Sequence, residues 1–128
     1  MHAKGTFDVK VTPLPPDAGD GSHIGRMSID KKFSGDIDGL SKGQMLAAMT
    51  TVQGSAGYVA MERVTATIGG RSGAFVLEHT GLMDRGRPSL TILVVPDSGT
   101  DGLAGIAGTM TIEIREGTHF YAFDYTLP

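Results

Sequence analysis

Glu62 and His79 are the two side chains whose types and positions could do chemistry together. They flank Gly69-Gly70-Arg71-Ser72, a segment between two alternating runs. This pattern predicts a β-hairpin, because glycine accepts the positive φ of tight hairpin turns. A two-residue loop at Gly70-Arg71, or a four-residue loop, places Glu62 directly opposite His79. Opposed side chains on one sheet face have Cβ atoms about 5 Å apart. A carboxylate and an imidazole at that spacing could exchange protons with a bound molecule.

The same register sorts the hairpin into an apolar face and a mixed face. Arg63 falls opposite Glu78 on the mixed face, and an opposite-charge pair is favourable there. Glu62 and His79 belong to the apolar face, which we expect to be buried. A buried carboxylate is costly unless it is paired. A satisfied structural pair is therefore the favoured interpretation, and an acid–base pair in a cavity is the alternative.

A metal at this pair would need a third ligand from elsewhere in the chain. The histidines His2, His23, His79 and His119 show no recognised ligand spacing. We therefore predict no metal site and no cofactor.

A second hairpin is predicted near the end of the chain, with Glu116-Gly117 as a two-residue turn. This turn places Ile114 opposite His119 and puts a row of aromatic side chains on one inward face. Together with the first hairpin, it supplies the candidate ligand-binding residues: Tyr58, Phe75, Leu77, His119, Tyr121, Phe123 and Tyr125. Plain core packing is the favoured alternative for the aromatic members of this set.

The remaining segments are short and mostly alternate in hydrophobicity. Strands are predicted over Thr6–Val11, Ile24–Phe33 and Leu90–Val95, and a loop over Pro13–Gly21. Leu90–Val95 is apolar on both faces, which is typical of a strand covered on both sides. Ser41–Thr51 has helix-forming residues but lies among β segments, which favours a strand. One helical turn, capped by Thr100 or Ser98, is predicted near residues 98–106.

Eight such segments predict an all-β fold with a single domain over residues 1–128: an antiparallel eight-stranded barrel. A barrel of this size is either packed with side chains or wide enough for one small ligand.

Composition excludes several classes of function. The net charge of −3 argues against nucleic acid and anionic membranes as partners. Without cysteine, the chain has no disulfide or thiol chemistry. The first residues lack the apolar core of a signal peptide, so a cytoplasmic protein is the default expectation.

Several motifs together resemble a bacterial family, a domain of unknown function that is similar to the allene oxide cyclase barrels. They are Glu62-Arg63-Val64, Gly69–Gly73 with Phe75 to Leu77 and His79, Val94-Val95-Pro96, Ser98-Gly99-Thr100, Leu103, Gly105, Gly108, and Tyr121-x-Phe123-Asp124-Tyr125. The resemblance covers nearly the whole chain. It implies the eight-stranded barrel and a strand at Ser41–Thr51. No motif carries the catalytic residues of the plant cyclases onto this chain.

Three functions remain open at this stage. The first is a barrel that binds a small lipophilic molecule in its interior. The second is a cofactor-free isomerase or cyclase in which Glu62 is the general base or an anionic stabiliser, and His79 orients it or shuttles a proton. The third is a packed barrel that serves interaction or homo-oligomer formation. The binding barrel is our leading hypothesis, and the sequence leaves enzymatic activity undecided.

Overall fold

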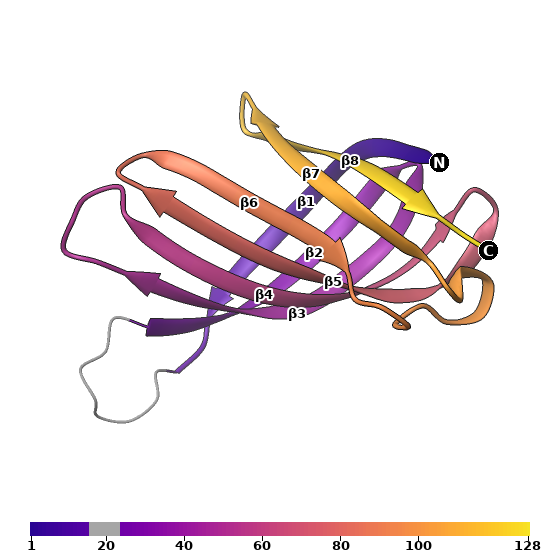
Figure 1. Ribbon diagram of the computed structural model, residues 1–128, viewed down its shortest axis with the longest axis horizontal. Coiled ribbons are helices and arrows are strands. Elements are labelled where there is room, and N and C mark those ends of the chain that lie inside the picture. Colours follow the sequence, from indigo (N-terminus) through magenta and orange to yellow (C-terminus); the bar gives the residue numbers. More distant parts are fainter. Residues whose placement is uncertain (16–23) are drawn as a thin grey trace.

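Eight antiparallel strands close into one barrel in strict sequence order, as predicted (Figure 1). The computed structural model describes residues 1–15 and 24–128. Most of the predicted loop over Pro13–Gly21, and also His23, lie outside the described residues. The strands are β1 (His2–Pro13), β2 (Ile24–Gly35), β3 (Ile37–Met49), β4 (Ala56–Ile68), β5 (Arg71–Asp84), β6 (Arg87–Val94), β7 (Ala107–Arg115) and β8 (Thr118–Thr126).

The strand at Ser41–Thr51 is confirmed, since β3 runs through this segment to Met49. Its helix-forming residues are overruled by pairing on both sides, with β2 and with β4. Local propensity is worth less than 1 kcal/mol per residue for these side chains, and tertiary pairing outweighs it.

The central hairpin is confirmed, but its predicted register is wrong by two residues. Gly69 and Gly70 both adopt positive φ, of 58° and 80°, and together form the two-residue loop. Glu62 therefore lies opposite Leu77, and His79 lies opposite Ala60. Arg63 likewise faces Val76 instead of Glu78. A shift of two residues keeps every side chain on its predicted face, because the pleat has a period of two.

The last hairpin has the predicted register. Glu116 and Gly117 form the turn with φ of 50° and 79°. Ile114 pairs with His119, Ile112 with Tyr121 and Met110 with Phe123.

One end of the barrel is closed by the connection between β6 and β7. This segment contains a single 3-10 turn, η1 (Asp101–Leu103), within the predicted range, and it buries Leu103 and Ile106. Thr100 occupies the N-cap position of η1 but makes no side-chain cap bond, so the predicted capping is wrong. Its hydroxyl instead accepts a hydrogen bond from the backbone N–H of Ala74 on β5, at 3.1 Å. The segment thus continues the sheet where β6 has already ended.

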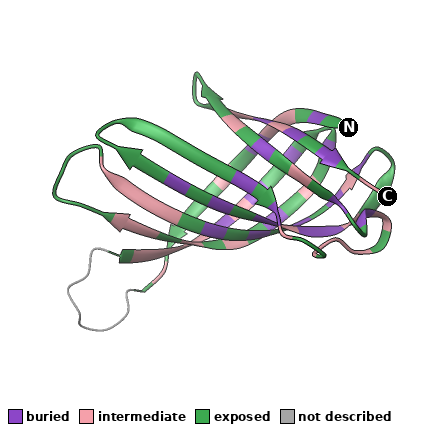
Figure 2. Cartoon of the chain, in the orientation of Figure 1, coloured by how far each residue is buried: buried purple, intermediate pink, exposed green. Residues whose placement is uncertain are grey.

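The core fills this closed end and the middle of the barrel (Figure 2). Phe75, Phe123 and Tyr125 form a stack, with ring centroids 5.7 and 5.2 Å apart. Phe33 contacts Tyr121 edge to face, with centroids at 5.6 Å. Aromatic pairs in such arrangements stabilise a core beyond the effect of buried area alone.

Tyr121 links β8 to the turn between β2 and β3. Its hydroxyl donates to the Ser34 carbonyl at 2.9 Å and accepts from the Ile37 backbone N–H at 2.8 Å. It passes over Gly5 of β1, where a Cβ atom would lie 2.6 Å from the hydroxyl oxygen. Glycine at position 5 is thus needed for the close approach of these strands.

Tyr121→Phe should lower the free energy of unfolding by about 1–3 kcal/mol, because the buried Ile37 N–H loses its acceptor. Urea titration measures the change. Tyr125→Phe is the matched control, since the Tyr125 hydroxyl makes no hydrogen bond within the described part of the chain. This variant should change the free energy of unfolding by less than about 0.5 kcal/mol. Equal losses in the two variants would contradict this role of Tyr121.

At the opposite end of the barrel, apolar side chains of the described residues that face the barrel axis are exposed, and we call it the open end. The loops at residues 50–55, 85–86 and 116–117 lie there. β6 and β7 meet through two residue pairs near the closed end, Ile92–Met110 and Leu93–Thr109. Beyond them the β7–β8 hairpin diverges from β6, as Figure 1 shows. β6 and β7 are therefore not paired with each other over the part of their length nearer the open end.

Candidate functional site

Glu62 and His79 do meet inside the barrel, although they are not directly opposed. They are diagonal neighbours on the inward faces of β4 and β5, and both are buried. His79 Nε2 lies 2.6 Å from Glu62 Oε1. The predicted contact therefore survives the register shift, because diagonal pairs on one face remain within reach of long side chains.

Two further polar side chains complete a cluster that sequence reasoning missed. Lys31 Nζ of β2 donates to Glu62 Oε1 at 2.9 Å, and Ser41 Oγ of β3 donates to Oε2 at 2.6 Å. Both residues are buried. We refer to Lys31, Ser41, Glu62 and His79 as the buried cluster. Four consecutive strands each contribute one member.

Lys31 is also held by aromatic rings. Its Nζ lies 4.6 Å from the ring centroid of Phe7 and 5.8 Å from that of Phe33. Desolvated cation–π contacts of this kind are worth up to about 2 kcal/mol. The ammonium is thus packed between a carboxylate and two aromatic faces, which explains how a lysine is accommodated in the core.

The environment of Glu62 favours its ionised form. Burial raises the pKa of this carboxyl group, but the hydrogen bond from His79, the charge of Lys31 and the hydrogen bond from Ser41 together outweigh it. The resulting pKa lies at about 2, below the ordinary 4.5. At neutral pH Glu62 is a carboxylate with both oxygens occupied.

This arrangement supports the structural interpretation of the pair. A general base near neutral pH needs a pKa close to the working pH and a free oxygen near the substrate. Glu62 has neither property in this structure. Catalysis by Glu62 and His79 stays a prediction that the geometry does not favour.

Tyr58 shares the inward face of β4 with Glu62 and lies nearer the open end. Its ring lies over Gly81 of β5, where an added Cβ atom would be 2.2 Å from Cε1 of the tyrosine. Burial and the negative charge of Glu62 both raise the pKa of the Tyr58 hydroxyl. The phenol is therefore neutral at physiological pH and can serve as a hydrogen-bond donor.

The predicted ligand-binding residues fall into two groups. Phe75, Leu77, Tyr121, Phe123 and Tyr125 are buried and belong to the packed core. Tyr58 and His119 are partly exposed. The His119 ring packs on Phe7, with centroids 5.0 Å apart. Ligand contact stays a prediction for the whole set, and only the second group is accessible without repacking the core.

In the part of the chain that the structure describes, no three His, Cys, Asp or Glu side chains come together in a group that could hold a metal ion. Across residues 1–15 and 24–128 there is also no helix with the length and hydrophobicity to span a bilayer.

Comparison with known proteins identifies the family. Residues 3–125 match the model of DUF3224, described as a protein of unknown function. The chain belongs to the DUF3224 family. The bacterial unknown-function family expected from the sequence motifs is thereby confirmed.

A solved structure shows the same DUF3224 barrel. It is the crystal structure of a protein with unknown function from the DUF3224 family of Shewanella oneidensis MR-1. The two chains are 46% identical with a TM-score of 0.94, and the match covers 100% of this chain and 97% of the other. No curated protein matches the chain.

Proposed function

We propose that this DUF3224 barrel binds a small lipophilic molecule at its open end. One observation carries the proposal: apolar side chains that face the barrel axis there are 39–63% exposed. They come from five strands and are Val11, Met49, Met83, Leu90 and Ile114. Inward apolar residues of a filled barrel would be buried, as they are at the closed end.

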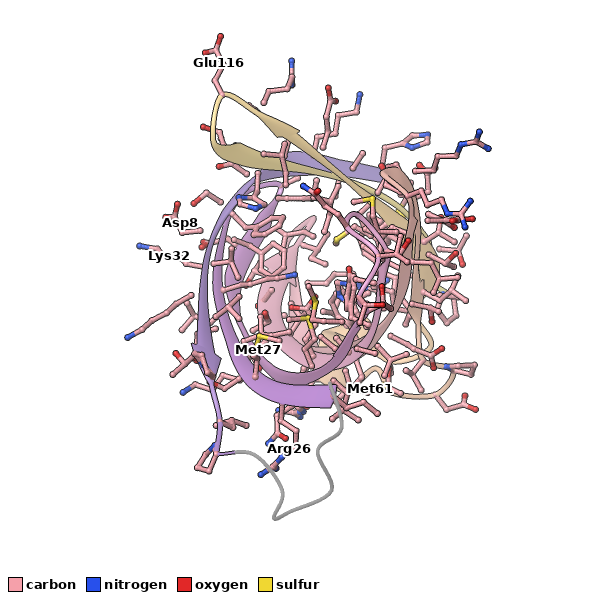
Figure 3. All side chains as sticks on the ribbon, turned by 90° about the vertical axis from the view of Figure 1, so that its left-hand side faces the viewer. Asp8, Arg26, Met27, Lys32, Met61 and Glu116 are labelled. Atoms are coloured by element: carbon pink, nitrogen blue, oxygen red, sulfur yellow. The ribbon has the colours of Figure 1, made fainter. Side chains whose placement is uncertain are left out.

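The composition of this end suits a ligand site. Met27 and Met45 are partly buried inward neighbours, and Figure 3, which looks into the open end, shows Met27 pointing into the barrel. Methionine side chains adapt to ligands of irregular shape. Tyr58 and His119 supply polar groups that could orient the molecule. The buried cluster then lies below the site as part of its support and makes no ligand contact.

Leu90→Glu should weaken binding of the fluorescent fatty acid cis-parinaric acid by about tenfold or more, because the carboxylate places a charge among the inward apolar groups. Fluorescence titration measures the dissociation constant. Ser89→Glu is the matched control: it adds the same charge on the adjacent residue, which is exposed and faces outward. It should change the constant by less than about twofold.

Nuclear magnetic resonance of methyl-labelled protein locates the probe. The methyl groups of Met49, Leu90 and Ile114 should shift on titration, whereas those of the core residue Leu103 should not. Absence of saturable binding, or equal weakening by both glutamates, would overturn the proposal.

A further inference from the structure

A second apolar surface lies on the outside of the barrel, over β3, β4 and β5. A groove of about 420 Å³ is lined there by outward side chains, among them Leu46, Val59 and Met61. The chain between them, at Met45 and Ala60, forms its floor. Alternation along each strand separates this groove from the barrel interior.

The apolar surface extends beyond the groove, along β5 to Leu82 and onto β6 at Leu93. Its members, which we call the outer patch, are 43–63% exposed: Leu46, Val59, Met61, Leu82 and Leu93. Leu46 pairs with Val59, while Glu78 lies between Met61 and Leu93. The predicted cover over both faces of β6 is therefore wrong for Leu93, which is exposed. Single exposed apolar residues are ordinary, but a contiguous group such as Leu46, Val59 and Met61 marks an interaction surface.

Two opposite charges lie on either side of the centre of this patch. Arg26 of β2 is beside Leu46, and Glu78 of β5 is beside Met61. Arg26 points outward from the barrel (Figure 3). One of its terminal nitrogens donates to the Pro15 carbonyl at 3.4 Å, while its Nε is buried without a hydrogen-bond partner. Within residues 1–15 and 24–128, neither Arg26 nor Glu78 forms an ion pair.

We propose that the outer patch is the interface with a second copy of this chain. A twofold axis lying in the interface, midway between Arg26 and Glu78, brings each arginine onto the glutamate of the other copy. The two copies then share an apolar centre of Leu46, Val59 and Met61, flanked by two identical ion pairs. This is the self-complementarity that a twofold interface requires, with the apolar centre and charged rim of stable interfaces.

Analytical ultracentrifugation tests the proposal. The wild type should sediment as a dimer of about 27 kDa, which is twice the 13.4 kDa of one chain. Val59→Glu should weaken the dimer by about a hundredfold or more, because it buries two like charges, one from each copy, at the apolar centre of the interface. Val59 is exposed in the single chain, so the substitution should leave the stability of the monomer unchanged. At a concentration where both proteins are monomeric, the variant and the wild type should therefore have the same urea unfolding midpoint.

Charge reversal identifies the pairing. Arg26→Glu and Glu78→Arg should each weaken the dimer by about tenfold or more, through like charges at both ends of the interface. The double variant Arg26→Glu/Glu78→Arg restores opposite charges in every pair and should recover the wild-type constant to within about threefold. A monomeric wild type, a dimer that survives Val59→Glu, or a double variant weaker than either single one would each overturn the proposal.

Discussion

Replacing Glu62 with glutamine should lower the free energy of unfolding by about 3–5 kcal/mol at neutral pH, because Lys31 is left buried without its counter-charge. The amide keeps the size of the carboxylate, so little of this loss comes from packing. The amide nitrogen of glutamine cannot accept a hydrogen bond, so the donors Lys31, Ser41 and His79 are left with a single acceptor oxygen. Urea titration of the two proteins measures the difference.

The control is Glu113→Gln, on the outer face of β7. The Glu113 side chain is 69% exposed and its contact with Arg115 is 3.4 Å long. Exposed pairs contribute about 0–1 kcal/mol, so this variant should stay within that range. A loss of less than about 1 kcal/mol in Glu62→Gln would show that the buried cluster does not stabilise the fold. Glu62 would then need another reason to be present, and its catalytic interpretation would regain support.

A double variant separates the effect of losing the charges from the effect of changing the packing of the core. Lys31→Met/Glu62→Leu removes both charges and keeps similar volumes. It should be more stable than Glu62→Gln by several kcal/mol, since apolar replacement of a whole buried pair is often neutral. Lys31→Met alone should be about as unstable as Glu62→Gln, because it leaves the carboxylate uncompensated. Adding Glu62→Leu as the second single variant completes a double-mutant cycle with Lys31→Met and the double variant, and this cycle measures the coupling between the two residues.

Much of the barrel could be predicted because its strands alternate and its turns carry glycine. The Glu116-Gly117 turn gave the correct register, since both residues adopt the positive φ that this dipeptide favours. The predicted loop at Gly70-Arg71 and the observed loop at Gly69-Gly70 both match the alternation of the strands. Apolar faces cannot distinguish registers that differ by two residues, because such registers present the same faces. The charge pair Arg63–Glu78 favoured the wrong one, and exposed pairs of this kind are too weak to decide.

The buried cluster could be predicted only in part. Glu62 and His79 stood out because polar residues interrupt an apolar face. Lys31 carried the same signal, as it lies between Ile29 and Phe33 in the inward row of β2. This signal is weak because lysine is seldom buried and the adjacent Lys32 is exposed. Ser41 could not be placed without knowing the pairing of β3.

Neither the open end nor the outer patch could be predicted from alternation. Leu90 and Leu93 face opposite sides of β6, and both are partly exposed. The exposure of Leu90 depends on where the pairing of β7 with β6 ends. The exposure of Leu93 depends on what packs against the outer face of the sheet. Sequence patterns report which face a residue takes, whereas the depth of burial is decided by contacts between strands far apart in the chain.

Acid should remove the stabilisation that Glu62 provides. The pKa of this carboxyl group falls from 4.5 to about 2 on folding. The ionised form is thus favoured in the folded state, and its contribution is complete above pH 4.5. As the pH falls from 4.5 towards 2, the unfolded chain binds a proton before the folded protein does, so stability decreases. A pKa change of this size corresponds to roughly 3 kcal/mol.

The Glu62→Gln variant isolates this contribution from that of the other carboxyl groups. Between pH 5.5 and pH 2, at constant ionic strength, the unfolding free energy of the wild type should fall by roughly 3 kcal/mol more than that of the variant. The gap between the two proteins therefore narrows in acid. Parallel curves over this range would mean that the Glu62 pKa is the same in the folded and unfolded chain. The ion pair with Lys31 and the hydrogen bonds from Ser41 and His79 would then stabilise the carboxylate no more than its hydration by water does in the unfolded chain.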